Sequence, residues 1–269
     1  MARRSKSNSQ SSIKKECRIP RIFMQTWKDT FVPNKWKDSP DSVSEKMGEW
    51  EYHLMTDDLN RAFVRDNFPD FLSTYDAYPY PIQRADAIRY MWLYMNGGVY
   101  MDLDIVINKP FDDFFTSDCD VYLVHSGNIG SVYTNALMAS KPGCSLWLEC
   151  LDEMKESFEN PSSLWIGRHL LVMNTTGPLM LSRVAAKTKC VIGTLPAKLL
   201  VPCSLCDLPC QIDDDIYAYA IPGSSWITWD TMVYNFFFCN WKNVVFVIIV
   251  LIIILFVFFL GWWLSRKTK

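Results

Sequence analysis

Short runs of apolar residues alternate along the chain with longer segments of mixed polarity, a pattern typical of strands that alternate with helices. Residues 21–27 form an apolar run after Pro20 and predict a buried parallel strand. Apolar and polar side chains alternate over residues 49–55, which predicts a half-buried strand. Further strands are expected over residues 99–107 and 121–124.

Three helices are predicted, two before the strand at residues 99–107 and one after the strand at residues 121–124. Polar side chains at residues 56–58 can cap a helix that runs to about Asn67. A second helix spans residues 82–95 and ends at Asn96-Gly97-Gly98, and a third spans residues 146–158. Because strands alternate with helices, we expect an α/β fold built on a sheet of parallel strands.

The longest apolar run lies near the C-terminus. The 21 residues from Val244 to Leu264 contain no charged side chain and, at about 1.5 Å per helical residue, can cross a hydrocarbon core of about 30 Å. Trp262-Trp263 lies where an interfacial aromatic belt is found. We therefore expect a single-pass membrane helix over residues 242–264, in contact with the lipid bilayer, and a short basic tail over residues 265–269.

The orientation across the membrane stays open at this stage. Residues 1–18 hold six basic residues against one acidic residue and almost nothing apolar, which predicts a disordered basic tail and not a signal peptide. An anchor near the C-terminus without a signal peptide favours a globular part in the cytosol. The basic residues after the apolar run, Arg266, Lys267 and Lys269, favour the opposite orientation.

Composition narrows the class of protein. The chain has 269 residues, 49% of them hydrophobic and 21% charged, with a formal net charge of −2. This balance excludes fibrous, collagen-like and wholly disordered proteins. It also argues against nucleic acid as a partner, because a general nucleic-acid binder carries a basic surplus. Residues 19–241 are numerous enough to bury a sizeable core, and we expect them to form one domain.

The most informative chemistry lies between residues 84 and 104. Asp86 and Arg89 are three residues apart on a predicted helix, so their side chains share a face. Asp102 and Asp104 are two residues apart on a predicted strand, so both carboxylates are expected to project to the same side. Such a pair can hold a hard divalent cation, which can also bind a diphosphate leaving group. The end of a strand is also where open α/β sheets bind their ligands.

Several segments together resemble a known family, in the order in which that family has them. The family consists of glycosyltransferases with a DXD sugar-binding region, and includes the initiating α-1,6-mannosyltransferases of yeast type and the inositol phosphoceramide mannosyltransferases. The resemblance covers nearly all of residues 19–234. Met24 is a departure, because the family often has His at that position. The matching segments are Ile19–Trp27, Arg84–Tyr90, Gly97–Asp104, Asn135–Ser140, Thr176–Pro178 and Ser225–Asp230.

The resemblance implies a GT-A-like fold with a Rossmann-type sheet that binds a nucleotide sugar, and a metal-dependent retaining transferase that uses Mn²⁺ or Mg²⁺. By position in the motif, Asp104 would bind the metal, and Asp102 would bind the ribose or a metal-bound water. These two carboxylates are the predicted catalytic and metal-binding residues. The predicted donor-binding residues are Gln25, Thr26, Trp27, Arg84, Asp86, Arg89, Asn135, Gly177, Pro178, Ser225 and Trp226.

The resemblance also implies substrates and a location. The motif spacing and the C-terminal apolar run are most similar to the inositol phosphoceramide mannosyltransferases, which implies GDP-mannose as the donor and a glycan or glycolipid as the acceptor. The implied location is the Golgi or another part of the endomembrane system. A membrane anchor suits a lipid acceptor, because substrate and site then share a plane.

Two other functions fit parts of the sequence. Asp102-Leu-Asp-Ile-Val106 also matches the motif of haloacid-dehalogenase-like phosphatases, with Asp102 as the nucleophile, but that motif normally lies on the first strand and does not explain residues 84–90. A membrane-tethered sugar-binding protein without catalysis is the third hypothesis.

The sequence also contains a group of three closely spaced cysteines. Cys203, Cys206 and Cys210 fit either half of a zinc site or a loop disulfide.

Overall fold

The computed structural model describes residues 19–115, 118–126, 132–162, 167–200, 202, 206, 212–221, 223 and 225–267. The predicted N-terminal tail over residues 1–18 lies outside the described residues, as do Cys203 and Cys210.

A six-stranded sheet forms the centre of the fold, with the strand order β2-β1-β3-β6-β5-β7. Its strands are β1 (Ile22–Thr26), β2 (Glu51–Met55), β3 (Gly98–Met101), β5 (Val121–His125), β6 (Tyr133–Ser140) and β7 (Ile192–Leu195). The expected α/β fold is confirmed, but the expectation of a wholly parallel sheet is wrong. Strand β6 runs antiparallel to both β3 and β5, because the short connection after β5 only allows the chain to return in the opposite direction.

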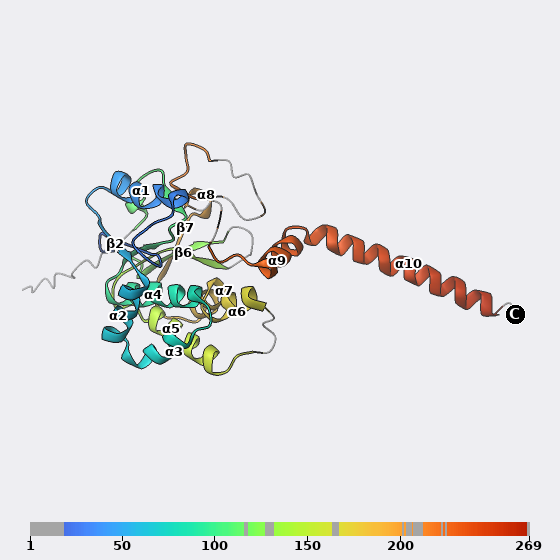
Figure 1. The fold of residues 1–269 in the computed structure, drawn as a ribbon. Coiled ribbons are helices and arrows are strands. Elements are labelled where there is room, and N and C mark those ends of the chain that lie inside the picture. The colour runs from blue at the N-terminus through green and yellow to red at the C-terminus, as the bar shows by residue number, and fades with distance from the viewer. Residues whose placement is uncertain are drawn as a thin grey trace, which may run out of the picture.

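Helices cover both faces of this sheet (Figure 1). Helices α1 and α8 lie on one face, and α2 to α7 lie on the other. The α-helices are α1 (Asp38–Met47), α2 (Asp57–Asn67), α3 (Leu72–Ala77), α4 (Pro81–Met95), α5 (Ser145–Glu159), α6 (Gly167–Thr175), α7 (Pro178–Ala185), α8 (Ala197–Leu200), α9 (Trp229–Cys239) and α10 (Trp241–Lys267). Short 3-10 helices are η1 (Asn34–Trp36), η2 (Pro69–Phe71) and η3 (Asp112–Phe114). Each face of the sheet contributes its own cluster of buried apolar side chains.

The local signals for helix ends are confirmed. The hydroxyl of Thr56 accepts a hydrogen bond from the amide of Leu59 at 3.3 Å and caps α2. Helix α4 begins at Pro81 and ends before Gly97, where φ is +66°. Tyr90 of this helix is fully buried and stacks on Trp147 of α5, with ring centroids 5.7 Å apart. Helix α4 is therefore held firmly beneath the sheet.

The Gly-Gly turn lets the chain pass from α4 into β3. Gly98 has φ of +82°, in the left-handed region that residues with a side chain rarely adopt. A Cβ atom at this position would also collide with the carbonyl oxygen of Ile22 on β1. Glycine is thus required both by the backbone conformation and by the close approach of β3 to β1.

We expect Gly98→Ala to lower the free energy of unfolding by about 3 kcal/mol, because the left-handed conformation and the collision both oppose a Cβ atom. The matched control is Gly143→Ala, where φ is +76° but no atom lies within 4 Å of the added Cβ. We expect this control to cost only about 1–2 kcal/mol. Denaturant unfolding of the two variants measures the difference, and equal losses would contradict the role assigned to the β1–β3 contact.

The predicted strand over residues 99–107 is wrong in its continuity, because a turn divides it into two strands. Strand β3 ends at Met101, residues 102–104 form a turn, and the amide of Ile105 donates to the carbonyl of Asp102 at 3.1 Å. The chain then enters β4 (Ile105–Ile107), which pairs with β8 (Ala218–Ala220) in a separate two-stranded sheet. Asp102 and Asp104 therefore lie in a tight turn, and strand alternation is not the reason for their common side.

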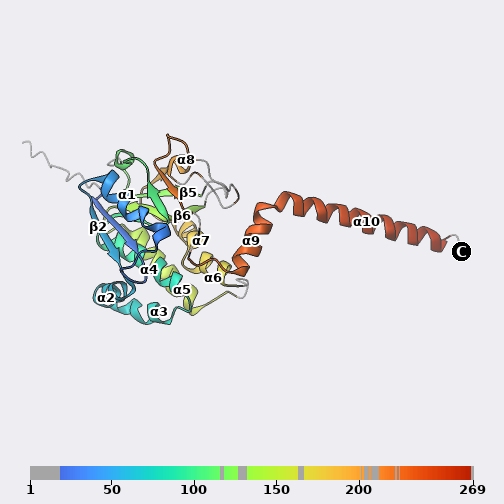
Figure 2. The ribbon, with the colours of Figure 1, turned by 45° about the horizontal axis from the view of Figure 1, so that its top comes forward.

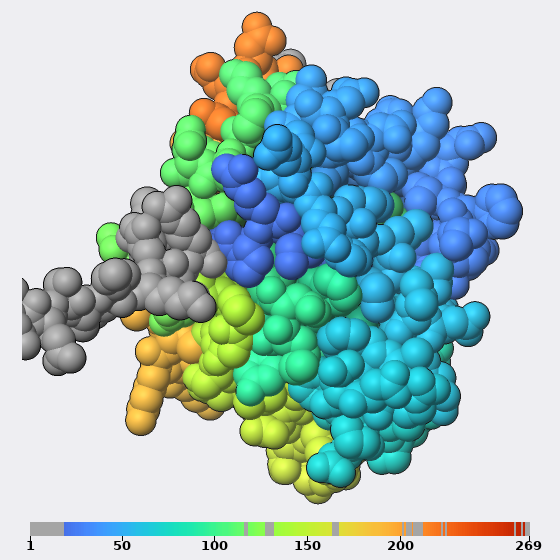
Figure 3. All heavy atoms as spheres, turned by 90° about the vertical axis from the view of Figure 1, so that its left-hand side faces the viewer, coloured from blue at the N-terminus to red at the C-terminus, as the bar shows by residue number. Residues whose placement is uncertain are grey.

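Helix α10 extends away from the rest of the chain (Figure 1). Residues Trp241–Leu264 are long and apolar enough to cross a membrane, and an 18-residue window within them has a mean hydropathy of 3.7 and no part buried inside the protein. Figure 3 shows the face on the opposite side of the molecule, where the early part of the chain, in blue and cyan, forms a continuous surface.

Candidate functional site

A cleft of about 430 Å³ opens at the carboxyl ends of β1 and β3. Its walls come from the end of β1, the start of α4, the turn after β3 and the loop before α9. A smaller hollow of about 230 Å³ shares several residues with it, among them Arg89, Asp102 and Asp104. The residues that line the cleft are Thr26, Trp27, Lys28, Trp36, Asp57, Pro81, Ile82, Ala85, Arg89, Tyr100, Asp102, Leu103, Asp104, Arg168, Ser225 and Trp226.

The charge of the Asp104 carboxylate is less neutralised by its neighbours than that of Asp102. Burial first, and then the nearby carboxylate of Asp102, raise the pKa of Asp104 to about 7, against the smaller effect of Arg89 and Lys35. No basic side chain in the part of the chain that the structure describes forms an ion pair with Asp104. A carboxylate in such surroundings is stabilised by any cation that enters the cleft.

Asp102 is held in place by its neighbours. Its Oδ1 atom accepts a hydrogen bond from the Tyr100 hydroxyl at 2.5 Å and lies 3.3 Å from Nη1 of Arg89. The Arg89 guanidinium also lies over the Tyr100 ring, 4.5 Å from its centroid. The backbone carbonyl of Asp102 accepts a hydrogen bond from Nε2 of the Gln25 side chain at 3.2 Å. The side chain and the backbone carbonyl of Asp102 are therefore both held in position.

Arg89 and Asp86 form a buried ion pair on α4, with Nη2 and Oδ1 3.0 Å apart and both side chains at most 4% exposed. This confirms that the two side chains share a helix face. Burial raises the pKa of Asp86 to about 6, although Arg89 and a hydrogen bond from Thr176 lower it. Burial lowers the pKa of Arg89, but electrostatic interactions with its neighbours, among them the carboxylates of Asp102 and Asp86, outweigh burial and raise it.

Residues distant in sequence complete the surroundings of this pair. Asn135 on β6 donates from Nδ2 to Asp86 at 3.0 Å, and its backbone carbonyl accepts from Arg89 at 2.7 Å. The Thr176 hydroxyl donates to the other oxygen of Asp86 at 2.7 Å. The network thus reaches from α4 through β6 to the start of α7. Thr176 was not among the predicted site residues, although it belongs to the matching segment Thr176–Pro178.

Three residues on the cleft wall carry buried N–H groups that have no hydrogen-bond partner among the described residues. These are Nε1 of Trp27, Nε1 of Trp36 and Nε of Arg168. The two indole rings meet edge to face, with centroids 5.1 Å apart. Unpaired donors and a guanidinium favour a ligand rich in acceptor oxygens and negative charge. Trp36 and Arg168 were missed from the sequence, because neither lies in a segment with a recognisable motif.

The loop before α9 supplies the outer wall. Ser225 and Trp226, two of the predicted donor-binding residues, line the cleft. The Trp226 ring stacks on His169, with centroids 5.4 Å apart and an interplanar angle of 8°. Burial lowers the pKa of His169. The ammonium of Lys35 donates to the carbonyl of Gly223 at 2.7 Å and ties this loop to the segment after β1.

Other predicted site residues lie behind the wall. Gln25 is fully buried, with Nε2 2.8 Å from the Ser39 hydroxyl. Arg84 donates to the carbonyl of Tyr78 at 2.9 Å, and Gly177 precedes the first turn of α7. None of these three lines the cleft, whereas Asp86, Asn135 and Pro178 line the adjoining hollow.

Asp102 and Asp104 are the two metal-ligand candidates that the turn after β3 contributes to the cleft. Among the residues described, no three or more His, Cys, Asp or Glu side chains come together as a metal site. Mg²⁺ is commonly bound by one or two carboxylates together with water and substrate phosphates. The Asp102–Asp104 turn fits a cation of that kind, because the pKa of Asp104 is raised by burial beside a second acid.

One cysteine of the Cys203–Cys210 group is also accounted for, since Cys206 is bonded to Cys239 on α9.

The chain is similar in sequence to a known family and to several known proteins. Residues 33–121 match the family described as glycosyltransferase sugar-binding region containing DXD motif. The chain is 34% identical over 221 residues to inositol phosphoceramide mannosyltransferase 2 of Schizosaccharomyces pombe, covering 82% of this chain and 62% of that protein. It is 34% identical over 164 residues to mannosyl phosphorylinositol ceramide synthase SUR1 of Saccharomyces cerevisiae, covering 61% of this chain and 41% of that protein. The solved PaToxG glycosyltransferase has a TM-score of 0.46 at 14% identity, covering 63% of this chain and 70% of that chain.

The matched region contains the residues on which the cleft depends. The Asp86–Arg89 pair and the Asp102–Asp104 turn all fall within residues 33–121. The chain spans less than two thirds of the length of the two yeast relatives. The resemblance inferred from the sequence is confirmed: residues 33–121 match the family of glycosyltransferase sugar-binding regions that contain a DXD motif.

Proposed function

We propose that the chain is a membrane-anchored, metal-dependent glycosyltransferase of the GT-A type. It transfers a sugar, with mannose from GDP-mannose as the first candidate, to a glycan or a glycolipid such as inositol phosphoceramide. The observation that carries this proposal is the Asp104 carboxylate, which lies beside Asp102 and has no ion-pair partner among the described residues, in a cleft whose lining residues carry buried N–H donors also without a partner among those residues.

The cleft suits a nucleotide diphosphate sugar. A divalent cation, Mn²⁺ or Mg²⁺, held by Asp104 and Asp102 would neutralise the charge that develops on the departing nucleotide. Arg89 and Tyr100 orient the Asp102 carboxylate toward this task. The guanidinium of Arg168 and the indole N–H groups of Trp27 and Trp36 would bind acceptor oxygens of the donor, because these residues line the cleft and their N–H groups have no partner among the described residues.

Two hypothesised alternatives are less well supported. A phosphatase would need Asp102 as a free nucleophile, yet its Oδ1 atom accepts from Tyr100 and is paired with Arg89. A sugar-binding protein without catalysis does not require the acid pair that raises the pKa of Asp104. The names of the relatives support mannose as the sugar and inositol phosphoceramide as the acceptor. The retaining stereochemistry is part of the proposal, and the anomeric configuration of the product tests it.

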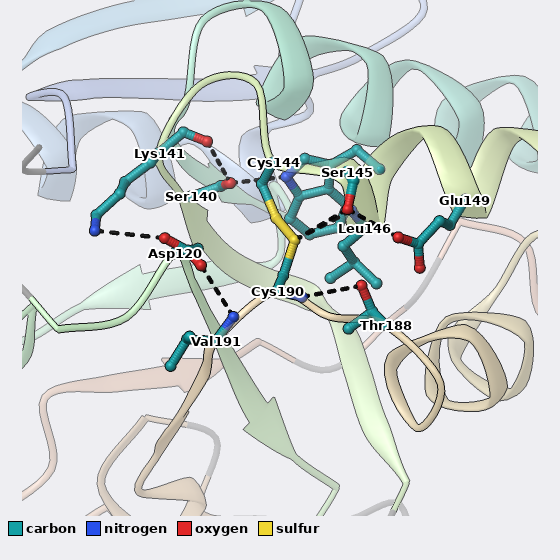
Figure 4. The surroundings of a disulfide bond; sticks show 11 residues. Asp120, Ser140, Lys141, Cys144, Ser145, Leu146, Glu149, Thr188, Cys190 and Val191 are labelled. Atoms are coloured by element: carbon teal, nitrogen blue, oxygen red, sulfur yellow. Dashed lines mark hydrogen bonds and ion pairs between the residues drawn. A yellow bond between two sulfur atoms is a disulfide. The ribbon is translucent and has the colours of Figure 1, made fainter.

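We further propose that residues 19–241 form the transferase domain and lie on the non-cytosolic side of a membrane, in the lumen of the Golgi or another endomembrane compartment. Two disulfides support this side, because such bonds persist in oxidising compartments. Cys144, just before α5, is bonded to Cys190, just before β7 (Figure 4). The second bond joins Cys206 to Cys239. Basic residues after the apolar run, Arg266 and Lys267, are those expected on the cytosolic side.

The test is a donor assay with the full chain in detergent or vesicles. We expect Mn²⁺-dependent transfer of mannose from GDP-mannose to inositol phosphoceramide, and slow donor hydrolysis when no acceptor is present. A panel of UDP-sugars and a soluble oligosaccharide acceptor identifies the specificity, and a generic phosphate ester is the control substrate. Cleavage of the ester through a phosphorylated Asp102 would establish a phosphatase. Sugar binding without any turnover would contradict the enzyme.

A further inference from the structure

Helix α9 carries a stripe of large apolar side chains on the side that faces away from the rest of the chain. The residues follow one another at intervals of three and one, which places them on one helix face. Their exposed fractions lie between 48% and 75%, although all are apolar. The members of this α9 stripe are Trp229, Met232, Val233, Phe236 and Phe237.

The opposite face of α9 is fixed against the protein, so the stripe cannot turn inward. Thr231 is 2% exposed, and the Tyr234 ring lies 5.1 Å from that of His169 on α6. The carboxylate of Asp230 accepts a hydrogen bond from the amide of His169 at 2.8 Å. The disulfide between Cys206 and Cys239 fastens the far end of the helix.

The position of α9 next to α10 indicates what covers the stripe. A single residue, Asn240, separates the two helices. Figure 2 shows α9 running across the direction of α10, between α10 and the rest of the chain. If α10 crosses a bilayer, α9 lies along the surface of that bilayer. Trp and Phe side chains are those that anchor helices at the boundary between headgroups and acyl chains.

We propose that α9 is an interfacial helix whose stripe inserts into the headgroup–acyl boundary of the phospholipid bilayer that α10 spans. This inference rests on the membrane anchoring in the proposed function. Trp226, three residues before α9, lines the cleft and stacks on His169, which α9 holds in place. Insertion of the stripe therefore sets the mouth of the cleft beside the membrane surface, where the headgroup of a lipid acceptor lies.

The first test locates the stripe directly. A photo-crosslinking amino acid replaces Val233 in the full chain, reconstituted in vesicles of phosphatidylcholine and phosphatidylinositol. We expect lipid adducts at position 233, and at least about tenfold fewer when the probe replaces Leu148, which is exposed on α5. A probe at Ile252 within α10 reports the anchor itself. Adducts at 252 with none at 233, or adducts that join 233 to a second copy of the chain, would overturn the inference. Absence of lipid adducts at both positions would overturn the anchoring together with the inference.

The second test asks whether the stripe serves the reaction. Phe236→Gln/Phe237→Gln is expected to lower transfer to an acceptor lipid in vesicles about tenfold, while donor hydrolysis by water stays within about twofold. Leu59→Gln/Leu148→Gln removes two exposed apolar side chains elsewhere and is expected to change neither rate. Undiminished transfer in the α9 variant would overturn the role in acceptor access. A wild-type chain that transfers no sugar would contradict the proposed function, and the crosslinking result would then still decide the membrane contact.

Discussion

Asp104→Asn is expected to lower the rate of sugar transfer about 10³-fold, equivalent to about 4 kcal/mol of transition-state stabilisation. The substitution keeps the shape of the side chain but removes the charge that the metal requires. The loss should appear in the maximal rate at saturating donor, and Mn²⁺ affinity should fall with it. Transfer rates and Mn²⁺ titration of the full chain measure both effects.

The same variant is expected to be more stable than the wild type at pH 8 without metal. Burial and Asp102 raise the pKa of Asp104 from its ordinary value of 3.8 to about 7, so the folded chain binds this proton more tightly than the unfolded chain. The stability that Asp104 contributes is therefore full below about pH 4 and is lost as the pH rises through about 7. Asp104→Asn lacks this loss. Denaturant unfolding at pH 5 and pH 8 measures it.

Asp70→Asn is the matched control for Asp104, because this carboxylate is exposed on η2 and far from the cleft walls. It should change neither transfer nor the pH dependence of stability. If Asp104→Asn kept a rate within about tenfold of the wild type, the assignment of the metal ligand would be wrong. A simultaneous loss of stability would instead indicate that Asp104 is a structural residue.

Arg89→Met is expected to lower the free energy of unfolding by about 3–5 kcal/mol, because it leaves the buried carboxylate of Asp86 without its partner. Transfer should fall as well, since Arg89 also orients Asp102. The double variant Asp86→Asn/Arg89→Met removes both charges and is expected to recover about half of the lost stability. Transfer should stay low in the double variant, because Asp102 still lacks Arg89. Denaturant unfolding and the donor assay separate the two effects.

Arg61→Met supplies the surface comparison. Arg61 is paired with Asp76 at 2.7 Å, but both side chains are largely exposed. Its loss is expected to cost less than about 1 kcal/mol. If Arg89→Met cost no more than this control, the buried pair would not stabilise the fold in the way proposed.

Much of the fold follows from local patterns. The apolar run at residues 21–27 and the alternation at residues 49–55 predict β1 and β2, and Thr56 and Gly97 mark helix ends that the structure confirms. These features depend on side-chain periodicity and on capping within a few residues, and both can be recognised in the sequence without knowledge of distant contacts.

The candidate site could be predicted only in part, because many of its contacts join residues that are far apart in the sequence. The Asp86–Arg89 pair is a contact within one helix and was predicted, whereas the bond from Thr176 to Asp86 joins residues 90 positions apart. Trp36 and Arg168 reach the cleft only because the fold brings η1 and α6 to its edge. Gln25 lies next to Thr26 in the same motif, yet strand alternation turns it away from the cleft that Thr26 lines, and there it supports the Asp102 carbonyl.

By itself, the sequence determined the alternation of strands and helices, the apolar helix near the C-terminus and the family that residues 33–121 match. Each of these is encoded in residues close together along the chain. Tertiary structure alone decided that β6 runs antiparallel, that Asp102 and Asp104 sit in a turn between two sheets, and that the stripe of α9 stays exposed. These features depend on which distant segments pair and pack. The same local pattern is compatible with more than one such arrangement.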